Sequence, residues 1–245
     1  MSDELLRGKH ALVTGGTRGI GAAITSILLS HGARVTTLGR SVAPPNVSAD
    51  ISDPNAITQA FHVARERSGT IDILVNNAGQ AGSAPFLKTD LELWQRMLTV
   101  NLSGTFLCSQ AALPDMLKSG WGRIVNIAST AGLTGYNYVS AYCAAKHGVV
   151  GLTRAMALEF ATKGVTVNAI CPGFTDTGLL DDAVSNIVAK TGRSPEEARA
   201  GLAARNPQKR LVQPGEVANA VAWLCLPGSQ SINGQAIAVA GGELM

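Results

Sequence analysis

The sequence of 245 residues is poor in charge and in aromatic side chains. Charged residues make up 15% of the chain, and 20 Lys and Arg against 17 Asp and Glu leave a net charge of only +3. This small excess is not concentrated in one segment, so binding to nucleic acid or to a membrane surface is not expected. Aromatic residues make up 4%, which offers no stacking platform for nucleic acid bases. The 46% of hydrophobic residues is enough for a sizeable core and excludes a disordered chain.

Cysteines and long apolar runs are also scarce. The four cysteines form no C-x-x-C pair and lie in apolar surroundings: Cys108, Cys143, Cys171 and Cys225. This pattern favours buried thiols in a reducing compartment and gives no metal site. No apolar run approaches the ~18 residues of a membrane span, and no basic segment precedes a long apolar stretch at the N-terminus. We therefore expect a cytoplasmic protein without a membrane segment or a secretory signal.

Short runs rich in Val, Ile and Leu alternate with longer helix-like patterns. The runs are His10–Thr14, Arg34–Leu38, Ile71–Val75, Arg123–Ala128, Val165–Cys171 and Gln235–Ala240. Continuous apolar strands separated by helices are typical of a parallel sheet covered on both faces. No linker or internal repeat divides the chain. We therefore expect one α/β domain over residues 1–245 with a doubly wound parallel sheet.

Capping patterns mark several helix starts and a polar excursion. The starts are Asp53-Pro54, Thr89 with Glu92, Ser194-Pro195 with Glu197, and Pro214 with Glu216. Residues 174–213 are more polar than the rest and carry several glycines and prolines. A long excursion at the carboxyl edge of a parallel sheet predicts a small helical substrate lid, and a plain surface insertion is the alternative.

A glycine-rich turn follows the first predicted strand. Gly15-Gly16-Thr17-Arg18-Gly19-Ile20-Gly21 leads directly into the apolar helix pattern of residues 22–29. Glycines let the backbone approach a pyrophosphate closely, and a helix N-terminus attracts its charge. The spacing is G-x-x-x-G-x-G, without the Lys-Ser/Thr of a nucleoside triphosphate loop. The turn therefore favours a dinucleotide site, and a tight strand-to-helix connection is the alternative.

The end of the second predicted strand lacks the carboxylate that holds a ribose 2′-hydroxyl in many dinucleotide sites. Gly39 stands there, Arg40 follows it, and Arg18 lies in the glycine turn. Guanidinium groups are well suited to a 2′-phosphate. The missing acid and the two bases together favour NADP(H) over NAD(H), although each Arg taken alone is also typical of a solvated surface.

Tyr142 and Lys146 lie four residues apart in a helical pattern, so both side chains belong to one helix face. A free Tyr has a pKa of about 10, and an ammonium group beside it favours the phenolate, as general acid–base work requires. Ser129 closes the strand Arg123–Ala128 at the edge where a site is expected, and could hydrogen-bond a substrate oxygen. An ordinary turn or helix-cap role is the alternative for this Ser.

These residues resemble the short-chain dehydrogenase/reductase family over nearly the whole chain. The motifs that carry the resemblance are TGGTRGIG at 14–21, NNAG at 76–79, Asn101, Ser129, Tyr142 with Lys146, and CPG at 171–173. The resemblance implies a single-domain Rossmann-type fold with a sheet of about seven strands. It also implies hydride transfer between a nicotinamide and a carbonyl carbon. Homotetramers, formed through the helices that bear Asn101 and Tyr142, are common in the family.

The resemblance assigns roles to individual residues. It makes Tyr142 the proton donor, Ser129 the group that orients the carbonyl oxygen, and Lys146 the group that lowers the Tyr142 pKa and holds the nicotinamide ribose. Asn101 would anchor a water that links Lys146 to solvent. Cofactor contacts are expected from Gly15, Thr17, Arg18, Gly19, Ile20, Gly21, Arg40, Asp50, Ile51, Asn77, Ala78, Gly79, Tyr142, Lys146, Pro172, Gly173 and Thr175.

The adenosine side departs from the family pattern. Only residues 41–49 separate Arg40 from Asp50, where most relatives have a full helix, and the two prolines in this segment exclude a normal helix. This short segment flanks the predicted adenosine site, so the contacts expected of Arg40 depend on its course.

The substrate is less sharply indicated. Segments such as GRIVNIASTAG and NAICPGF look most like 3-oxoacyl thioester reductases, including polyketide ketoreductases, and also like 3-hydroxybutyrate dehydrogenases. The lid carries five basic residues that could meet the phosphates of coenzyme A or an acidic carrier protein: Arg193, Arg199, Arg205, Lys209 and Arg210. A solvated helix face explains them equally well. We expect a 3-oxoacyl thioester reductase; a dehydrogenase of a small or cyclic secondary alcohol and a non-catalytic dinucleotide-binding protein are the alternatives.

Overall fold

The computed structural model describes residues 4–40 and 46–244. Within these residues, seven parallel strands form one sheet in the order β3-β2-β1-β4-β5-β6-β7. They are β1 (His10–Thr14), β2 (Arg34–Gly39), β3 (Val47–Ser48), β4 (Ile73–Asn76), β5 (Gly122–Ile127), β6 (Val165–Pro172) and β7 (Ala236–Val239). The strand order reverses between β1 and β4, and ligands of doubly wound sheets bind at such a switch point. The predicted fold class is confirmed.

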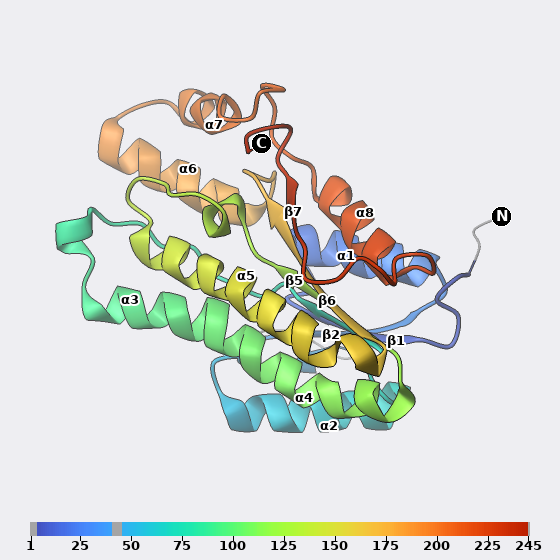
Figure 1. The fold of residues 1–245 in the computed structure, drawn as a ribbon. Coiled ribbons are helices and arrows are strands. Elements are labelled where there is room, and N and C mark those ends of the chain that lie inside the picture. The colour runs from blue at the N-terminus through green and yellow to red at the C-terminus, as the bar shows by residue number, and fades with distance from the viewer. Residues whose placement is uncertain (1–3, 41–45, 245) are drawn as a thin grey trace.

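Helices cover both faces of the sheet, as Figure 1 shows. On one face, α1 (Gly19–Ser30) and α8 (Pro214–Cys225) pack against each other. On the other lie α2 (Pro54–Ser68), α4 (Gly104–Ser119) and α5 (Ser140–Phe160). Helix α3 (Leu91–Leu98) continues into α4 through a π-helical turn, Thr99–Ser103. The layers account for the long apolar strands, because both faces of the central strands are covered.

Side chains alternate between two cores along each central strand. Leu12, Leu74, Ile124 and Val167 pair in register across four strands and belong to the core under α2, α4 and α5. The next row, Val13, Val75 and Val125, belongs to the core under α1 and α8. This period of two follows from the pleat of the strand. It fixes the register, because a slip of one residue would exchange the two cores.

The predicted lid segment forms a small helical unit above the carboxyl edge of the sheet (Figure 1). It contains α6 (Gly178–Thr191) and α7 (Pro195–Ala203), and a backbone bridge between Thr175 and Val212 closes its base. Leu180, Val184, Ala198 and Leu211 form an apolar cluster of their own. The Asn186 amide donates a 3.0 Å hydrogen bond to the Ser83 hydroxyl in the loop after β4.

Helix starts follow the capping patterns with one exception. Asp53, Ser194 and Gln213 precede α2, α7 and α8. Before α3, the prediction of a cap at Thr89 is wrong, because the Asp90 carboxylate accepts the hydrogen bond from the Leu93 N–H at 2.8 Å. The predicted absence of a helix in 41–49 lies partly outside the described residues. Within the described part, Val47–Ser48 form β3.

Candidate active site

The glycine turn joins β1 to α1 in a shape that requires small residues. Gly15 and Gly19 have φ values of +65° and +53°, in the left-handed region that favours glycine. A Cβ on Gly21 would overlap the Gly15 carbonyl oxygen and lie 2.6 Å from the Asn77 amide nitrogen. In the described part of the chain, no side chain caps α1 and its first turn carries no acidic residue. The first amides of α1 therefore suit an anionic group such as a pyrophosphate.

The loop after β4 is fastened to this turn. The Asn77 side-chain amide donates hydrogen bonds to the carbonyl oxygens of Thr14, at 2.9 Å, and Gly15, at 3.1 Å. The Thr14 hydroxyl oxygen accepts from the backbone N–H groups of Asn77, at 3.0 Å, and Ala78, at 2.9 Å. The NNAG segment and the glycine turn thus form one wall. Asn76 points elsewhere: it is buried and donates to Asn126 within the sheet.

Asn101 lies in the π-helical turn between α3 and α4, and it is almost fully buried. Its amide nitrogen donates to the carbonyl oxygens of Gln80 and Met97, each at 3.0 Å, and its amide oxygen accepts from the Gln80 N–H at 3.2 Å. A Cβ on Gly79 would lie 2.7 Å from this amide oxygen and 3.7 Å from Lys146 Nζ. Asn101 therefore anchors the end of the NNAG loop beside Lys146.

Ser129, Tyr142 and Lys146 come together at the carboxyl end of β5. Ser129 follows this strand and begins a 3-10 turn, Thr130–Gly132, while Tyr142 and Lys146 lie one turn apart on α5. The Ser129 side chain lies close enough to the Tyr142 hydroxyl to lower its pKa. Lys146 Nζ lies 5.7 Å from the centre of the Tyr142 ring and donates to the Ile127 carbonyl at 2.8 Å. The Ser129 hydroxyl also accepts from the Ala131 N–H at 3.1 Å, so it combines the turn-capping role with the Tyr142 contact.

Burial sets the protonation of this group. It raises the pKa of Tyr142 to about 12, and the hydrogen bond to Ser129 opposes the rise only in part. It lowers the pKa of Lys146 to about 8. Desolvation of the phenolate therefore dominates the net shift, and the lowering of the Tyr142 pKa by Lys146 stays a prediction. The Tyr142 hydroxyl is therefore protonated at neutral pH, whereas the pKa of Lys146 lies about one unit above neutral pH.

The residues predicted to contact the adenosine end of the cofactor follow β1, β2 and β3. Arg18 and Arg40 are both exposed. Hydrogen bonds from the Ser52 N–H, at 2.9 Å, and the Ser52 hydroxyl, at 2.7 Å, lower the pKa of Asp50, and the charge of Arg40 adds to this effect. Ile51 is buried, and a Cβ on Gly104 of α4 would lie 2.8 Å from its Cδ1. Arg40 and Asp50 are thus in electrostatic contact, while Ile51 is part of the core.

The segment after β6 completes the site. Pro172 ends the strand, and the Thr175 hydroxyl donates to the Gly173 carbonyl at 2.9 Å. Thr175 is buried at the base of the lid. The carboxyl ends of β1, β4, β5 and β6 therefore bring the glycine turn, the NNAG loop, Ser129 and Pro172 to one edge of the sheet, as expected for a doubly wound fold.

Comparison with known proteins agrees with this geometry. Residues 9–187, more than half of the chain, match the family model described as short chain dehydrogenase. The chain belongs to the short-chain dehydrogenase family. A putative ketoacyl reductase of Streptomyces coelicolor is 39% identical over 249 residues, which cover 95% of each chain. A D-beta-hydroxybutyrate dehydrogenase of Rhizobium meliloti is 36% identical over 96% of this chain and 98% of its own.

Solved structures show the same similarity. A variant of actinorhodin polyketide ketoreductase, crystallised with NADPH, superimposes with a TM-score of 0.91 at 38% identity. The match covers 96% of this chain and 97% of the ketoreductase. The expected family and the expected oxidoreductase class are thereby confirmed.

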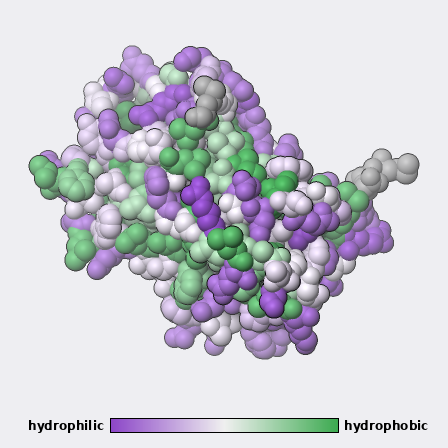
Figure 2. Space-filling view, in the orientation of Figure 1, coloured by the Kyte–Doolittle hydropathy of each residue, from purple (hydrophilic) through white to green (hydrophobic). Residues whose placement is uncertain are grey.

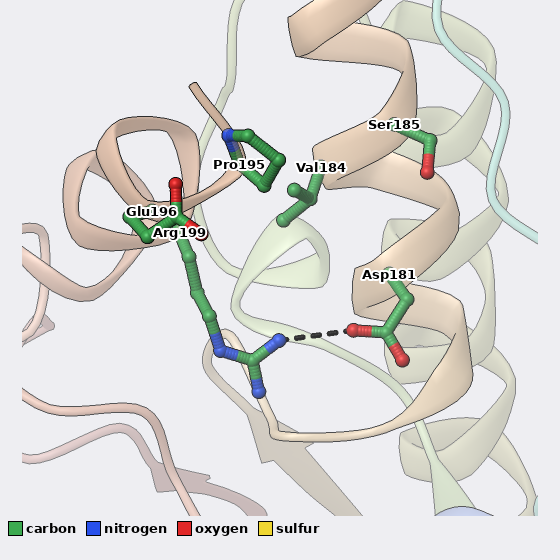
Figure 3. Close-up of a pocket in the computed structure, with 6 residues that line it drawn as sticks. All are labelled: Asp181, Val184, Ser185, Pro195, Glu196 and Arg199. Carbon is green, nitrogen blue, oxygen red and sulfur yellow. Dashed lines mark hydrogen bonds and ion pairs between the residues drawn. The ribbon is translucent and has the colours of Figure 1, made fainter. Parts of the chain in front are cut away.

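The basic residues of the lid divide into different environments in this dehydrogenase. Arg199 of α7 forms ion pairs with Asp176 after β6 and with Asp181 of α6, the latter at 2.9 Å (Figure 3). A shallow cavity of about 290 Å³ lies beside this guanidinium, lined by Asp181, Val184, Ser185, Pro195, Glu196 and Arg199. It lies between α6 and α7 and contains none of the residues predicted for catalysis or for binding the nicotinamide cofactor. Arg210 pairs with Glu216 at 2.6 Å. Two of the five basic residues that could meet a phosphate are therefore paired with carboxylates.

Sequence analysis missed a polar cluster next to the Ser129 turn of the dehydrogenase. The Tyr136 hydroxyl is hydrogen-bonded to Thr130 and to Glu243, and the Arg205 guanidinium lies over the Tyr136 ring. These residues lie far apart in the sequence and follow no motif. The one local signal is the Gly241-Gly242 pair before Glu243, which predicts a sharp turn but not its target.

Two further findings concern the described part of the chain, residues 4–40 and 46–244. It holds no group of three or more His, Cys, Asp or Glu side chains placed to bind a metal ion. None of its helices has the length and apolar character to cross a membrane.

Proposed function

We propose that the protein is an NADP(H)-dependent reductase of 3-oxoacyl thioesters. The observation that carries the proposal is the meeting of Ser129, Tyr142 and Lys146 beside the glycine turn. The ketoacyl reductase among its relatives supports the substrate class. The proposed enzyme is one domain over residues 1–245, with residues 174–213 as the substrate lid.

The protein residues supply the proton and its surroundings. Tyr142 keeps its proton at neutral pH because burial raises its pKa to about 12. It gives up this proton only when negative charge develops on the carbonyl oxygen, which the Ser129 hydroxyl also binds. The phenolate left behind is then stabilised by the Lys146 ammonium group on the same helix face. Asn101 holds the loop against which Lys146 lies, and in the proposed role it anchors the water that returns protons to Lys146.

The nicotinamide cofactor fits the residues present. The uncapped start of α1 and the glycine turn suit the pyrophosphate, and a Cβ at Gly21 would fill the turn. When bound, the nicotinamide supplies the hydride for the carbonyl carbon. The proposed contacts follow the edge of the sheet: Gly15, Thr17, Arg18, Gly19, Ile20, Gly21, Arg40, Asp50, Ile51, Asn77, Ala78, Gly79, Tyr142, Lys146, Pro172, Gly173 and Thr175.

A preference for NADP(H) is supported by charge. The second strand ends in Gly39 instead of an acidic residue, and the exposed Arg18 and Arg40 offer guanidinium groups to a 2′-phosphate. The NADPH-bound ketoreductase is a structural neighbour with the same fold. The charge of Arg40 also acts on Asp50, whose pKa it helps to lower.

A second candidate function is the oxidation of a small hydroxy acid. The hydroxybutyrate dehydrogenase relative favours it, and the same three residues would serve, since Tyr142 then accepts the proton instead of donating it. The ion pairs of Arg199 and Arg210 leave fewer free basic groups in the lid for a carrier phosphate.

We propose a cytoplasmic homotetramer. The described cysteines are all unpaired thiols, as a reducing compartment allows. Phe86, Leu87 and Leu91 expose 77%, 96% and 67% of their surface, and Figure 2 shows apolar side chains gathered over the edge of the molecule that carries them. An apolar patch of this kind is typical of an association surface. It lies on the 3-10 turn Phe86–Lys88 and at the start of α3.

The test is the oxidation of NADPH by acetoacetyl-CoA, followed at the nicotinamide absorbance band. NADH is the parallel arm, and Tyr142→Phe is the control. We expect oxidation that is faster with NADPH and lost in the variant. No turnover with either cofactor, in a protein that binds NADPH, would contradict thioester reduction and lead to hydroxybutyrate and cyclic alcohols. Faster turnover with NADH would overturn the cofactor preference.

A further inference from the structure

Tyr136 joins segments that are far apart in the sequence. Its hydroxyl lies 2.8 Å from the Thr130 hydroxyl and 2.7 Å from a carboxylate oxygen of Glu243. The Tyr136 ring meets the Phe174 ring edge-on, with 6.2 Å between the ring centres. The Arg205 guanidinium lies 4.9 Å from the centre of the Tyr136 ring. The Ser129 turn, the two ends of the lid and the C-terminal segment therefore converge on one half-buried side chain.

The direction of these hydrogen bonds follows from the chemistry of the groups. Burial raises the pKa of Tyr136 to about 12, and the Glu243 carboxylate adds to the rise, so the hydroxyl keeps its single proton. A carboxylate only accepts hydrogen bonds. Tyr136 therefore donates to Glu243 and accepts from the Thr130 hydroxyl. The bond to the charged carboxylate is the stronger of the two.

Glu243 reaches Tyr136 because the chain turns sharply after β7. Gly241 and Gly242 have φ values of +60° and +91°, and the Glu243 N–H donates to the Ala240 carbonyl at 3.2 Å. A Cβ on Gly241 would overlap the side-chain oxygen of Asn206, so the turn requires glycine there. The carboxylate ends 3.1 Å from the place of a Cβ on Gly173, directly after β6.

Thr130 transmits this contact to the catalytic residue before it. Thr130 is buried, and its carbonyl accepts from the N–H groups of Leu133 and Thr134 at 2.9 and 3.0 Å. The Ser129 carbonyl accepts from the Gly132 N–H at 2.8 Å within the same turn. The backbone of this turn sets the direction of the Ser129 side chain. A shift of Thr130 would therefore move the Ser129 hydroxyl relative to Tyr142.

We propose that Glu243 is a positioning residue for catalysis: its carboxylate holds the Tyr136 hydroxyl, Tyr136 holds Thr130, and the held turn keeps Ser129 against Tyr142. The inference rests on the reaction of the short-chain dehydrogenase family and not on the choice of thioester as substrate. A misplacement of about 1 Å at a reacting group can reduce the rate about 100-fold. Glu243 and Tyr136 therefore act on kcat.

The test uses variants that remove one contact at a time. Tyr136→Phe keeps the ring on Phe174 and Arg205 and removes the hydroxyl. Glu243→Ala removes the acceptor, and Glu243→Gln keeps a neutral acceptor in its place. We expect kcat to fall about tenfold in Tyr136→Phe and in Glu243→Ala, with KM for the nicotinamide cofactor within about twofold of wild type. Glu243→Gln is expected to recover most of the lost kcat.

The double variant separates positioning from independent structural damage. If Glu243 acts through Tyr136, the double variant of Tyr136→Phe and Glu243→Ala loses no more kcat than either single variant. The matched control is Tyr138→Phe, since Tyr138 is an exposed Tyr on the same loop. It is expected to leave kcat unchanged. Thermal unfolding of each variant identifies any loss that reflects the folded fraction.

Three results would overturn the proposal: wild-type kcat in Tyr136→Phe, equal losses in Glu243→Gln and Glu243→Ala, or losses that multiply in the double variant. Each value is a ratio to the wild-type rate on the best carbonyl or alcohol substrate of a panel. A wrong substrate class under the proposed function would therefore change the reference reaction and leave the ratios intact.

Discussion

Lys146 donates a 2.8 Å hydrogen bond to the carbonyl oxygen of Ile127, the last residue of β5. The ammonium group is thus held at the end of the strand that leads into Ser129, while its own helix carries Tyr142. It is almost fully buried, and no carboxylate among the described residues contributes to its pKa. The hydrogen bond to Ile127 satisfies part of this buried cation, and the burial of Lys146 makes the stability of the protein depend on pH.

The first prediction concerns this pH dependence. Burial lowers the pKa of Lys146 to about 8, whereas the unfolded chain has a value of about 10.4. Between these values the unfolded state binds more protons than the folded state. The cost of burying Lys146 therefore falls as pH rises, and the folded protein becomes more stable. Below pH 8 the folded state carries the full cost of the buried charge.

Lys146→Met removes this cost. We expect the stability of the variant relative to wild type to be greatest near pH 7. This difference in the free energy of unfolding should decline by up to about 3 kcal/mol toward pH 10. Urea unfolding of both proteins at the two pH values measures the change. Lys118→Met, at an exposed site, is the control and should show no such trend. A pH-independent difference for Lys146→Met would contradict the prediction.

The second prediction concerns Ser129. Ser129→Ala removes the hydroxyl that binds Tyr142, and the pKa of Tyr142 rises further as a result. The proposed stabilisation of the carbonyl oxygen is lost as well. We expect kcat to fall about 100-fold, as is typical when one oxyanion donor is removed, while NADPH binding persists.

Ser140→Ala is the matched control for Ser129. The Ser140 hydroxyl is buried without a hydrogen-bond partner among the described residues, so its removal should leave both the rate and the unfolding temperature nearly unchanged. Equal rates for Ser129→Ala and wild type would show that Ser129 only caps its turn.

The third prediction concerns the glycine turn. Gly21→Ala places a methyl group on the Gly15 carbonyl oxygen, so the turn must open. We expect a loss of stability of about 1–3 kcal/mol and a loss of NADPH binding, measured by thermal unfolding and by fluorescence titration. Gly151→Ala is the control, because open space surrounds that position in α5. It should stabilise the protein by about 0.5–1 kcal/mol. Unchanged NADPH affinity in Gly21→Ala would place the cofactor elsewhere.

The fourth prediction concerns the adenosine phosphate. Arg40→Ala should raise KM for NADPH about tenfold and leave KM for NADH within twofold, because only NADPH carries the 2′-phosphate. Arg34→Ala is the control: this Arg, at the opposite end of β2, donates to the Gly8 carbonyl at 3.2 Å. Equal losses with NADPH and NADH would contradict the prediction and indicate a structural role for Arg40 instead of binding of the 2′-phosphate.

The fold was predictable because its determinants are local. Apolar runs in the sequence predict most of the strands. Strand β3 has only two residues and is too short for such a pattern. The cap of α3 could not be predicted because two neighbouring residues compete for it. Thr89 and Asp90 are both competent caps, but the Thr89 hydroxyl donates to the Pro85 carbonyl at 3.2 Å, and Asp90 is left to cap the helix. Sequence identifies the candidates, and the preceding turn decides between them.

The site was predictable as a set of residues and not as an electrostatic arrangement. Spacing placed Tyr142 and Lys146 on one face, but the direction of the Tyr142 pKa shift depends on burial, which the spacing does not contain. Tyr136 and Glu243 are separated by 107 positions, so no local pattern relates them. Their contact depends on the turn at Gly241 and Gly242 and on the course of the strands before it.

The lid has an apolar cluster that is separate from the two cores of the sheet. Among the described residues, the bridge between Thr175 and Val212 closes its base, and it meets the rest of the protein through contacts such as the Asn186–Ser83 hydrogen bond and the packing of Phe174 and Arg205 on Tyr136. A unit of this kind opens at a lower free energy than the sheet that carries it. In deuterated solvent, amides of α6 and α7 should therefore exchange well before those of β1, β4 and β5. A substrate bound beneath them should slow that exchange without altering the sheet.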